Sequence, residues 1–263
     1  MSDRYLLKDK VALVTGAGAG IGRSSAILLA RAGASVVVCN DKNIEAGNET
    51  MNIIKSEGGK STFIRTDVSN NDEVKILISR TKEIYGGLDI LFCNAGITNY
   101  VDLAEMAEPD IDRILDVNLK GSILCAKYAI PLMQERGGGS IVFCSSVLNM
   151  IGFPQCVVYS ATKAGQISAA RTLAVEVGKY NIRVNSVSPG TINTPMLERD
   201  MVDMNADQVQ EYTKKVCNAN ALGRIGEPEE VGNAVVWLSS SEASYITGAN
   251  LYIDGGFTAV KRI

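Results

Sequence analysis

Short apolar runs alternate with longer stretches of helical periodicity along most of the 263-residue chain. The apolar runs are too short for helices and are bounded by glycine, asparagine, aspartate or proline, so each predicts a β-strand. The longer stretches place apolar residues near a period of 3.6 and predict helices. The expected strands are 11–14, 36–39, 61–65, 88–93, 140–144, 183–187 and 249–254, and the expected helices run from 21 to a stop at Gly33 and over 72–85, 109–118, 121–133, about 156–179 and 228–239.

This alternation favours an α/β fold in which helices cover both faces of a doubly wound parallel sheet. No Pro/Ser-rich linker, repeat or low-complexity tract divides the chain, so residues 1–263 are expected to form a single domain. The helices within 109–133 are expected to bend or pause around Lys120-Gly121. From about 191 to 220 the periodicity weakens among scattered methionines and charges, which indicates either a substrate lid or a surface excursion.

The first expected strand is followed by T-G-A-G-A-G-I-G, in which Gly16, Gly20 and Gly22 have the spacing G-x-x-x-G-x-G. A turn without Cβ atoms lets the N–H groups at the start of the next helix approach a pyrophosphate. The position after the first strand favours dinucleotide binding over a plain glycine-rich turn. Asp41 follows the second strand, where an acidic residue either holds a ribose 2′-hydroxyl or caps the next helix.

Tyr159 and Lys163 are four residues apart on the expected helix at 156–179, so their side chains share one face. An ammonium beside a phenol favours the phenolate and lowers the pKa of the phenol, which brings it closer to acid–base work at neutral pH. Ser146, at the end of the preceding strand, can donate a hydrogen bond to an oxygen on which negative charge develops. The spacing Y-x-x-x-K also arises by chance, so an ordinary pair on a helix surface is the alternative interpretation.

The composition of the chain argues against several classes of function. The chain has 26 basic and 29 acidic residues in no marked blocks, and this net charge of −3 favours neither nucleic acid nor an anionic membrane as a partner. It has no apolar run of transmembrane length and a polar beginning, so a cytoplasmic protein is expected. The six cysteines include no C-x-x-C pair and are expected to be reduced. The absence of histidine excludes Ser-His and Cys-His triads and most zinc sites, so no metal is expected.

Seven motifs occur together in the order of a known family. Ser146 precedes Tyr159 by 13 residues, as expected in that family. From Lys10 to about Phe257 the chain resembles the classical short-chain dehydrogenases/reductases. The resemblance implies a Rossmann-type fold with a seven-stranded parallel sheet, a nicotinamide cofactor and, as is common among members, a homotetramer. The motifs are T-G-x-x-x-G-x-G at 15–22, Asp67-Val68, N-A-G at 94–96, Asn118, Ser146, Y-x-x-x-K at 159–163 and Pro189-Gly190.

The same resemblance implies residue roles. Tyr159 is expected to be the acid–base on the substrate oxygen, and Lys163 to lower its pKa and hold the nicotinamide ribose. Ser146 is expected to polarise the substrate oxygen, and Asn118 to support a water chain that relays the proton. The expected cofactor contacts are Gly16, Gly20, Ile21, Gly22, Asp41, Asp67, Val68, Asn94, Tyr159, Lys163, Pro189, Gly190, Ile192 and Thr194. The expected substrate contacts are Ser146, Met150, Gln155, Tyr159 and Met196.

The sequence therefore predicts an NAD(P)-dependent oxidoreductase that interconverts a secondary alcohol and a ketone. The expected pocket wall is mostly apolar and lacks a positive cluster, which favours a medium-sized, cyclic substrate over a phosphorylated one. NAD is expected over NADP, because Asp41 would repel a 2′-phosphate and Ala19 offers no cation in the glycine turn. The alternatives are a 3-oxoacyl-[acyl-carrier-protein] reductase-like enzyme that uses NADPH and a dinucleotide sensor on the same fold.

Overall fold

The computed structural model describes residues 7–40 and 43–259. Seven parallel strands form one sheet in the order β3-β2-β1-β4-β5-β6-β7, which confirms the predicted fold class. The order reverses between β1 and β4, and doubly wound sheets bind ligands at such a point, beyond the carboxyl ends of the strands. The strands are β1 (Val11–Thr15), β2 (Ser35–Asn40), β3 (Ser61–Arg65), β4 (Ile90–Cys93), β5 (Gly139–Cys144), β6 (Ile182–Pro189) and β7 (Asn250–Ile253).

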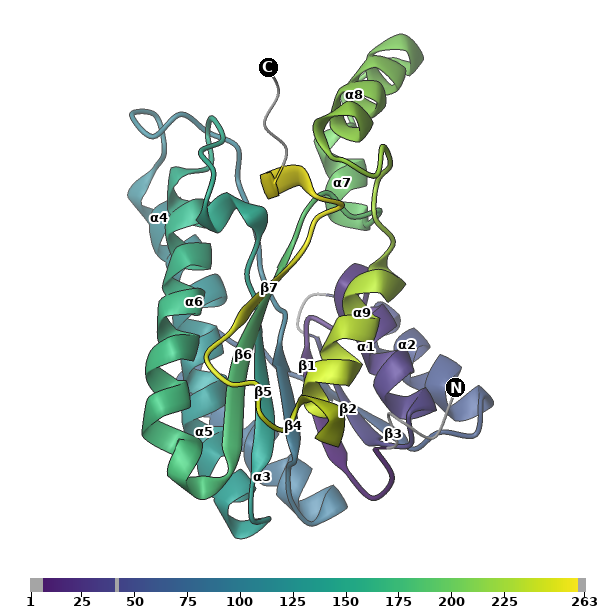
Figure 1. The fold of residues 1–263 in the computed structure, drawn as a ribbon, viewed down its shortest axis with the longest axis vertical. Coiled ribbons are helices and arrows are strands. Elements are labelled where there is room, and N and C mark those ends of the chain that lie inside the picture. Colours follow the sequence, from purple (N-terminus) through teal and green to yellow (C-terminus); the bar gives the residue numbers. More distant parts are fainter. Residues whose placement is uncertain (1–6, 41–42, 260–263) are drawn as a thin grey trace.

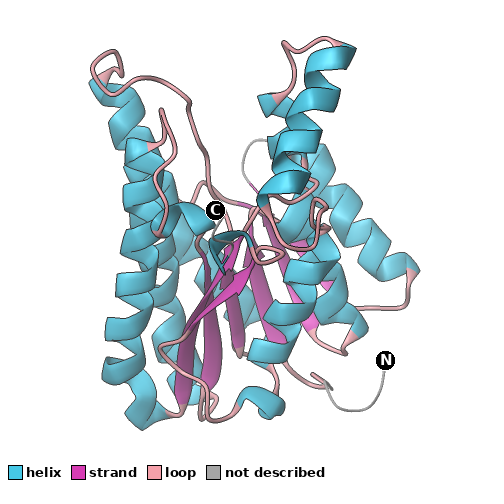
Figure 2. Cartoon of the chain, turned by 45° about the horizontal axis from the view of Figure 1, so that its top comes forward, coloured by secondary structure: helices cyan, strands magenta, loops and turns pink. Residues whose placement is uncertain are grey.

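Helices cover both faces of this sheet (Figures 1 and 2). Successive strand residues point to opposite faces, so Leu13 packs into one core while Ala12 and Val14 pack into the other. All of β1 is buried, as expected of a central strand in a parallel sheet. One layer contains α1 (Gly20–Arg31), α2 (Ile44–Ser56) and α9 (Pro228–Ser239), and the other contains α3 (Asn71–Tyr85), α5 (Gly121–Glu135) and α6 (Val157–Val177).

A π-helical turn, Leu115–Lys120, joins α4 (Glu108–Ile114) to α5. The sequence predicts a bend or pause at Lys120-Gly121, but both residues have helical backbone angles, so the helix continues through them. Gly121 serves close packing instead of a break. A Cβ atom on it would lie 2.9 Å from the carbonyl oxygen of Val68, so only glycine allows this approach.

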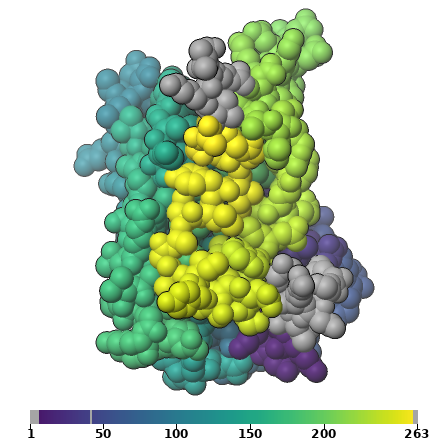
Figure 3. Space-filling view, viewed as in Figure 1, coloured from purple at the N-terminus to yellow at the C-terminus, as the bar shows by residue number. Residues whose placement is uncertain are grey.

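Residues 191–220, whose sequence pattern is irregular, include two helices, α7 (Pro195–Asp200) and α8 (Ala206–Ala219). Proline in the first turn starts α7, and Asn205 and Gln208 form a capping box at the start of α8. Both helices stand beyond the carboxyl edge of the sheet, and Figure 3 shows α8 beside the yellow C-terminal segment. No helix in the described part of the chain is long and apolar enough to span a membrane.

Candidate active site

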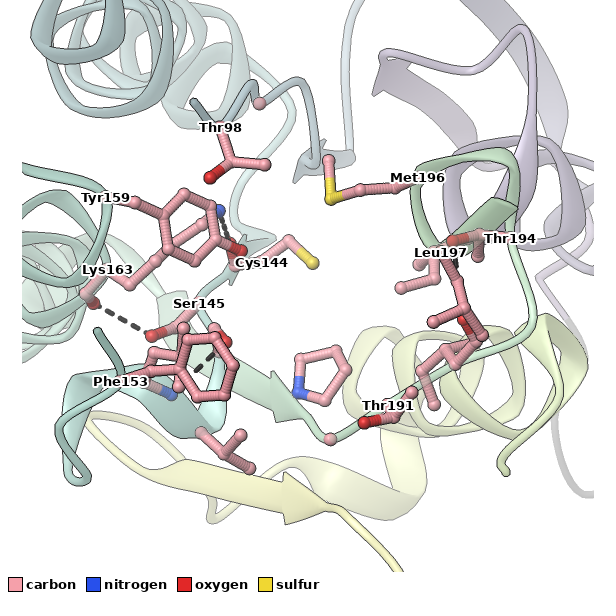
Figure 4. A pocket seen from close by; sticks show the side chains of 18 of the residues that line it. Thr98, Cys144, Ser145, Phe153, Tyr159, Lys163, Thr191, Thr194, Met196 and Leu197 are labelled. Carbon is pink, nitrogen blue, oxygen red and sulfur yellow. Dashed lines mark hydrogen bonds between the residues drawn. The ribbon is translucent and has the colours of Figure 1, made fainter. Parts of the chain in front are cut away.

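A cavity of about 250 Å³ lies at the carboxyl ends of β4, β5 and β6. Its walls come from the segments that follow these strands, together with α6 and α7. Figure 4 shows Tyr159 and Cys144 on one side of the cavity and Met196 and Leu197 of α7 facing them from the other. The cavity is therefore placed where the strand order of the sheet predicts a ligand site.

The glycine turn after β1 has the close packing of a backbone cradle. Gly16 has φ +63°, and a Cβ atom on it would lie 2.9 Å from the Cα atom of Ala95. A Cβ atom on Gly22 would overlap the carbonyl oxygen of Gly16. The helix α1 begins at Gly20 with no side-chain cap, and uncapped N–H groups at a helix start suit a pyrophosphate. The residues present therefore fit a nicotinamide dinucleotide.

Hydrogen bonds fasten this turn to the end of β4. The hydroxyl oxygen of Thr15 accepts the N–H groups of Asn94 and Ala95 at 3.0 and 3.1 Å. The side-chain nitrogen of Asn94 donates to the carbonyl oxygens of Thr15 and Gly16 at 3.0 and 3.2 Å. The predicted cofactor residue Asn94 lines the cavity, and its amide group also holds the turn. Thr15, the first residue of the T-G-x-x-x-G-x-G motif, had no predicted role of its own and completes this set of contacts.

Tyr159 lies in the first turn of α6, and Ser146 precedes the 3₁₀ turn Val147–Asn149; both line the cavity. Burial raises the pKa of the Tyr159 phenol well above its usual value, and a hydrogen bond with Ser146 offsets only part of the rise. The net direction of this pKa is therefore upward, because burial is the largest effect, and the lowering expected from Lys163 stays a prediction. The Ser146 hydroxyl oxygen also accepts the N–H of Leu148 at 3.2 Å.

Lys163 is 3% exposed, and its ammonium lies 5.3 Å from the centre of the Tyr159 ring. Its Nζ donates to the carbonyl oxygen of Cys144 over 2.7 Å, and its own carbonyl accepts the Ser145 hydroxyl at 2.8 Å (Figure 4). These two bonds tie α6 to the end of β5. Burial lowers the pKa of Lys163. Gly96 lies beside the ammonium, since a Cβ atom on it would be 3.4 Å from Nζ.

Asn118 lies in the π-helical turn and is fully buried. Its side-chain oxygen accepts the Ile97 N–H at 2.8 Å, and its side-chain nitrogen donates to the Ile97 carbonyl at 2.9 Å and to the Thr162 hydroxyl at 3.2 Å. Its backbone carbonyl accepts the side chains of Ser122 and Gln166 at 2.7 and 2.8 Å. Asn118 therefore connects the loop after β4 to α6.

Asn149 positions Ser146 and was not found from the sequence. Its side-chain nitrogen donates to the Ser146 carbonyl and, at 2.9 Å, to the Ser188 hydroxyl of β6. The hydroxyl of Tyr252 on β7 donates to its side-chain oxygen at 3.0 Å. These partners lie 39 and 103 residues away in the sequence, so no local pattern could reveal the contact.

Some of the remaining predicted residues line the cavity and others do not. Ile21, Pro189, Gly190, Ile192, Thr194 and Met196 line the cavity as expected of ligand contacts. Met150 and Gln155 do not line it, and the side chain of Met150 is 65% exposed, because the loop turns both residues outward. Asp67 accepts hydrogen bonds from the N–H and hydroxyl of Ser69, and Val68 is buried. Asp41 lies outside the described residues.

The wall of the cavity formed by α7 and α8 also carries polar groups that the sequence did not indicate. Asp200, at the end of α7, accepts a hydrogen bond from the Tyr100 hydroxyl over 3.2 Å. Burial raises the pKa of Asp200. Tyr212 of α8 lines the cavity as well. The expectation of a mostly apolar wall is therefore incomplete on this side.

Comparisons with known proteins agree with this arrangement. A family model described as enoyl-(acyl carrier protein) reductase matches residues 16–258. The chain is 40% identical over 262 residues to the 2,5-dichloro-2,5-cyclohexadiene-1,4-diol dehydrogenase of Sphingobium indicum, an alignment that covers 99% of this chain and 100% of the relative.

Two solved structures share the fold and bind different cofactors. The gluconate 5-dehydrogenase of Burkholderia cenocepacia, solved with NADP and tartrate, has a TM-score of 0.90 and 30% identity, covering 98% of this chain and 99% of that chain. A 7α-hydroxysteroid dehydrogenase, solved with NADH and 7-oxo glycochenodeoxycholic acid, has a TM-score of 0.91 and 32% identity, covering 97% of each chain. With the family match spanning the glycine turn and the Ser146, Tyr159 and Lys163 cluster, these likenesses show that the chain belongs to the short-chain dehydrogenase/reductase family of oxidoreductases.

Proposed function

We propose that this chain is an NAD-dependent dehydrogenase that interconverts a secondary alcohol and a ketone on a medium-sized cyclic substrate. The observation that carries the proposal is the pairing of Tyr159 with Ser146 on the wall of a cavity that the glycine turn adjoins. The nicotinamide dinucleotide, when bound, supplies or accepts a hydride. The protein groups then have to manage the proton and the charge on the substrate oxygen.

Tyr159 and Ser146 suit that task. Because burial raises its pKa, the Tyr159 phenol holds its proton at neutral pH and can donate it to a carbonyl oxygen as the ketone becomes an alcohol. Oxidation of the alcohol requires the reverse transfer, onto a phenolate. The Ser146 hydroxyl offers a second hydrogen bond to the same oxygen and stabilises the charge that develops there.

Lys163 and Asn118 support this pair. The Lys163 ammonium has three N–H donors. Among the described residues it makes one hydrogen bond, to the Cys144 carbonyl. Its remaining donors are available to a ribose hydroxyl, as the family resemblance implies. The side-chain amide of Asn118 is occupied by Ile97 and Thr162, so in this proposal it positions the loop after β4 rather than contacting substrate.

The preference for NAD is supported by how Arg23 is held. Arg23 is the cation of the first turn of α1, but its Nε donates to the Gly18 carbonyl at 2.9 Å and to the Thr50 hydroxyl at 3.1 Å. Its Nη2 pairs with Glu49 at 2.6 Å. These bonds turn the guanidinium toward α2, so it is not free to bind a 2′-phosphate. The role of Asp41 at the ribose stays a prediction.

A 3-oxoacyl-[acyl-carrier-protein] reductase of Thermotoga maritima, 38% identical to this chain over 252 residues, favours a second candidate, an NADPH-dependent enzyme of that kind. The cyclic diol substrate in the name of the Sphingobium relative supports the first candidate. We therefore place a cyclic alcohol or ketone ahead of an acyl thioester.

One assay separates these candidates. Nicotinamide absorbance is followed with NAD and NADP against cyclic and linear secondary alcohols, and with NADPH against a 3-oxoacyl thioester. We expect NAD-dependent turnover of a cyclic alcohol, and a fall in kcat of about 10²-fold or more for Tyr159→Phe. Tyr180→Phe is the matched control, because Tyr180 is 41% exposed and does not line the cavity. Turnover of the thioester alone, or an active Tyr159→Phe enzyme, would contradict the proposal.

A further inference from the structure

The cavity contains one carboxylate, that of Asp200. Among its described lining residues Asp200 is the only acidic side chain, and Lys163 is the only basic one. The two belong to different walls, because Lys163 comes from α6 and Asp200 from α7. Lys163 is bonded to the Cys144 carbonyl beside Tyr159. Asp200 is therefore the charged side chain on the α7 wall of the cavity.

Asp200 is fixed by a contact between distant segments. The Tyr100 hydroxyl donates to its Oδ2 over 3.2 Å, and the Tyr100 ring stands nearly edge-on to that of Phe153 at 6.5 Å. Arg199 is the cation that acts on Asp200, but it is exposed and its Nε donates to the Pro195 carbonyl. Within residues 7–40 and 43–259 the carboxylate is therefore held in place without a direct ion pair.

The polar atoms of the cavity lining that lack a hydrogen-bond partner among the described residues include one on Thr98 and one on Asp200. One is the hydroxyl oxygen of Thr98, which is buried two residues before Tyr100; Figure 4 shows the Thr98 side chain at the cavity near Tyr159. The other is Oδ1 of Asp200, because the one hydrogen bond of this carboxylate is made by Oδ2. A buried hydroxyl without a partner is costly, so a ligand with a matching hydrogen-bond group is favoured here.

We propose that Asp200 and Thr98 bind a second hydroxyl group of the substrate, apart from the carbon that Tyr159 serves, and that Asp200 excludes substrates with an anionic group there. The Asp200 carboxylate only accepts hydrogen bonds, whereas the Thr98 hydroxyl both donates and accepts. A hydroxyl group can donate to the carboxylate and can also accept from the Thr98 hydroxyl, whereas an ammonium group can only donate to them. The inference rests on the proposed alcohol–ketone chemistry and narrows the substrate class to cyclic diols and hydroxyketones.

Ligand binding tests this independently of turnover. The Tyr159→Phe variant is loaded with NADH, and its nicotinamide fluorescence is titrated with cyclohexanone, 4-hydroxycyclohexanone, 4-aminocyclohexanone and 4-oxocyclohexanecarboxylate. We expect the hydroxyketone to bind about 10-fold more tightly than cyclohexanone and the carboxylate to bind most weakly. Adding Asp200→Asn should remove most of the hydroxyl preference and tighten carboxylate binding by about 10-fold. Asp203→Asn is the matched control, because it removes an exposed carboxylate between α7 and α8 that does not line the cavity.

A second variant distinguishes substrate recognition by Asp200 from a purely structural role of the Tyr100–Asp200 hydrogen bond. Tyr100→Phe removes the hydrogen bond to Asp200 but keeps the carboxylate, so the order of the four ligands should survive. If Tyr100→Phe and Asp200→Asn lost affinity equally for all four ligands, the Tyr100–Asp200 contact would be purely structural and the proposal would be overturned. So would tighter binding of the aminoketone than of the hydroxyketone.

The same ketones and the same variants distinguish a failure of this inference from a failure of the proposed function. If the unmutated enzyme reduces none of the ketones but its binding order is as expected, the proposed reaction fails and the role of Asp200 stands. If it reduces cyclohexanone and 4-hydroxycyclohexanone with equal kcat/KM, and Asp200→Asn changes neither value, the reaction stands and the role of Asp200 fails.

Discussion

Asn118→Ala removes three hydrogen bonds from a fully buried position, two to the backbone of Ile97 and one to Thr162. The Ile97 N–H and carbonyl would lose these partners, and each buried unpaired group costs about 1–3 kcal/mol. Counting these two groups at the lower half of that range, we expect a loss of about 3 kcal/mol in the free energy of unfolding. For a chain near this length 1 kcal/mol lowers Tm by about 2–4 °C, so Tm should fall by roughly 6–12 °C.

Thermal unfolding followed by circular dichroism measures this change. Asn48→Ala is the matched control, since the Asn48 side chain bonds to the Ile44 carbonyl on the exposed side of α2. Alanine is also the better helix former there, so its Tm should stay level or rise slightly. A variant of Asn118 that keeps the Tm of the unmutated protein and loses only activity would refute the positioning role. That outcome would favour the proton-relay role that the family resemblance implies.

Further predictions concern the cofactor, the proton and the assembly. Gly22→Ala should weaken NADH binding by about 10-fold or more, because the new Cβ atom would overlap the Gly16 carbonyl. Fluorescence titration measures this, and Gly178→Ala is the control because a Cβ atom on Gly178 would meet no neighbouring atom. Glu49→Gln should free Arg23 and raise the ratio of kcat/KM for NADP over NAD about two- to fivefold, a small change because the ion pair is exposed; an unchanged ratio would show that Arg23 cannot reach the ribose. Since burial raises the pKa of Tyr159, alcohol oxidation should accelerate as the pH rises and more phenolate forms, while ketone reduction stays level through neutral pH; pH–rate profiles in both directions would expose the opposite trend. The homotetramer expected from the family resemblance, through α5, α6 and β7, predicts a light-scattering mass near four times 28.1 kDa, and a monomer would refute it.

The fold was predictable because its signals are local. The central strands β1 and β4 are short apolar runs, and the residues that follow them contain the glycine of the turn and the asparagine that holds it. Helical spacing likewise placed Lys163 next to Tyr159, which the structure confirms at 5.3 Å from ring to ammonium. The α8 helix was harder to predict, since none of its residues is fully buried and its start depends on a capping box.

The parts of the site that sequence reasoning missed depend on contacts between distant segments. Asp200 meets Tyr100 from 100 residues away, and Asn149 meets Tyr252 from 103. The pKa of Tyr159 was expected to fall because its lysine neighbour is visible in the sequence, whereas the burial that raises it appears only in the fold. Met150 was assigned to the pocket by its place in the loop after β5, but the path of that loop turns it to solvent.

The π-helical turn at residues 115–120 makes the number of residues there a determinant of the site. A π-helical turn holds one residue more than an α-helical turn, so a single deletion that restored regular α-helix would leave α4 and α5 nearly in phase but would remove the widened turn that carries Asn118. The contacts of Asn118 with Ile97 and Thr162 would then be broken, although every side chain of the catalytic cluster was still present. In this region a change of chain length is more damaging than most substitutions, because the extra residue of the turn presents Asn118 to its partners.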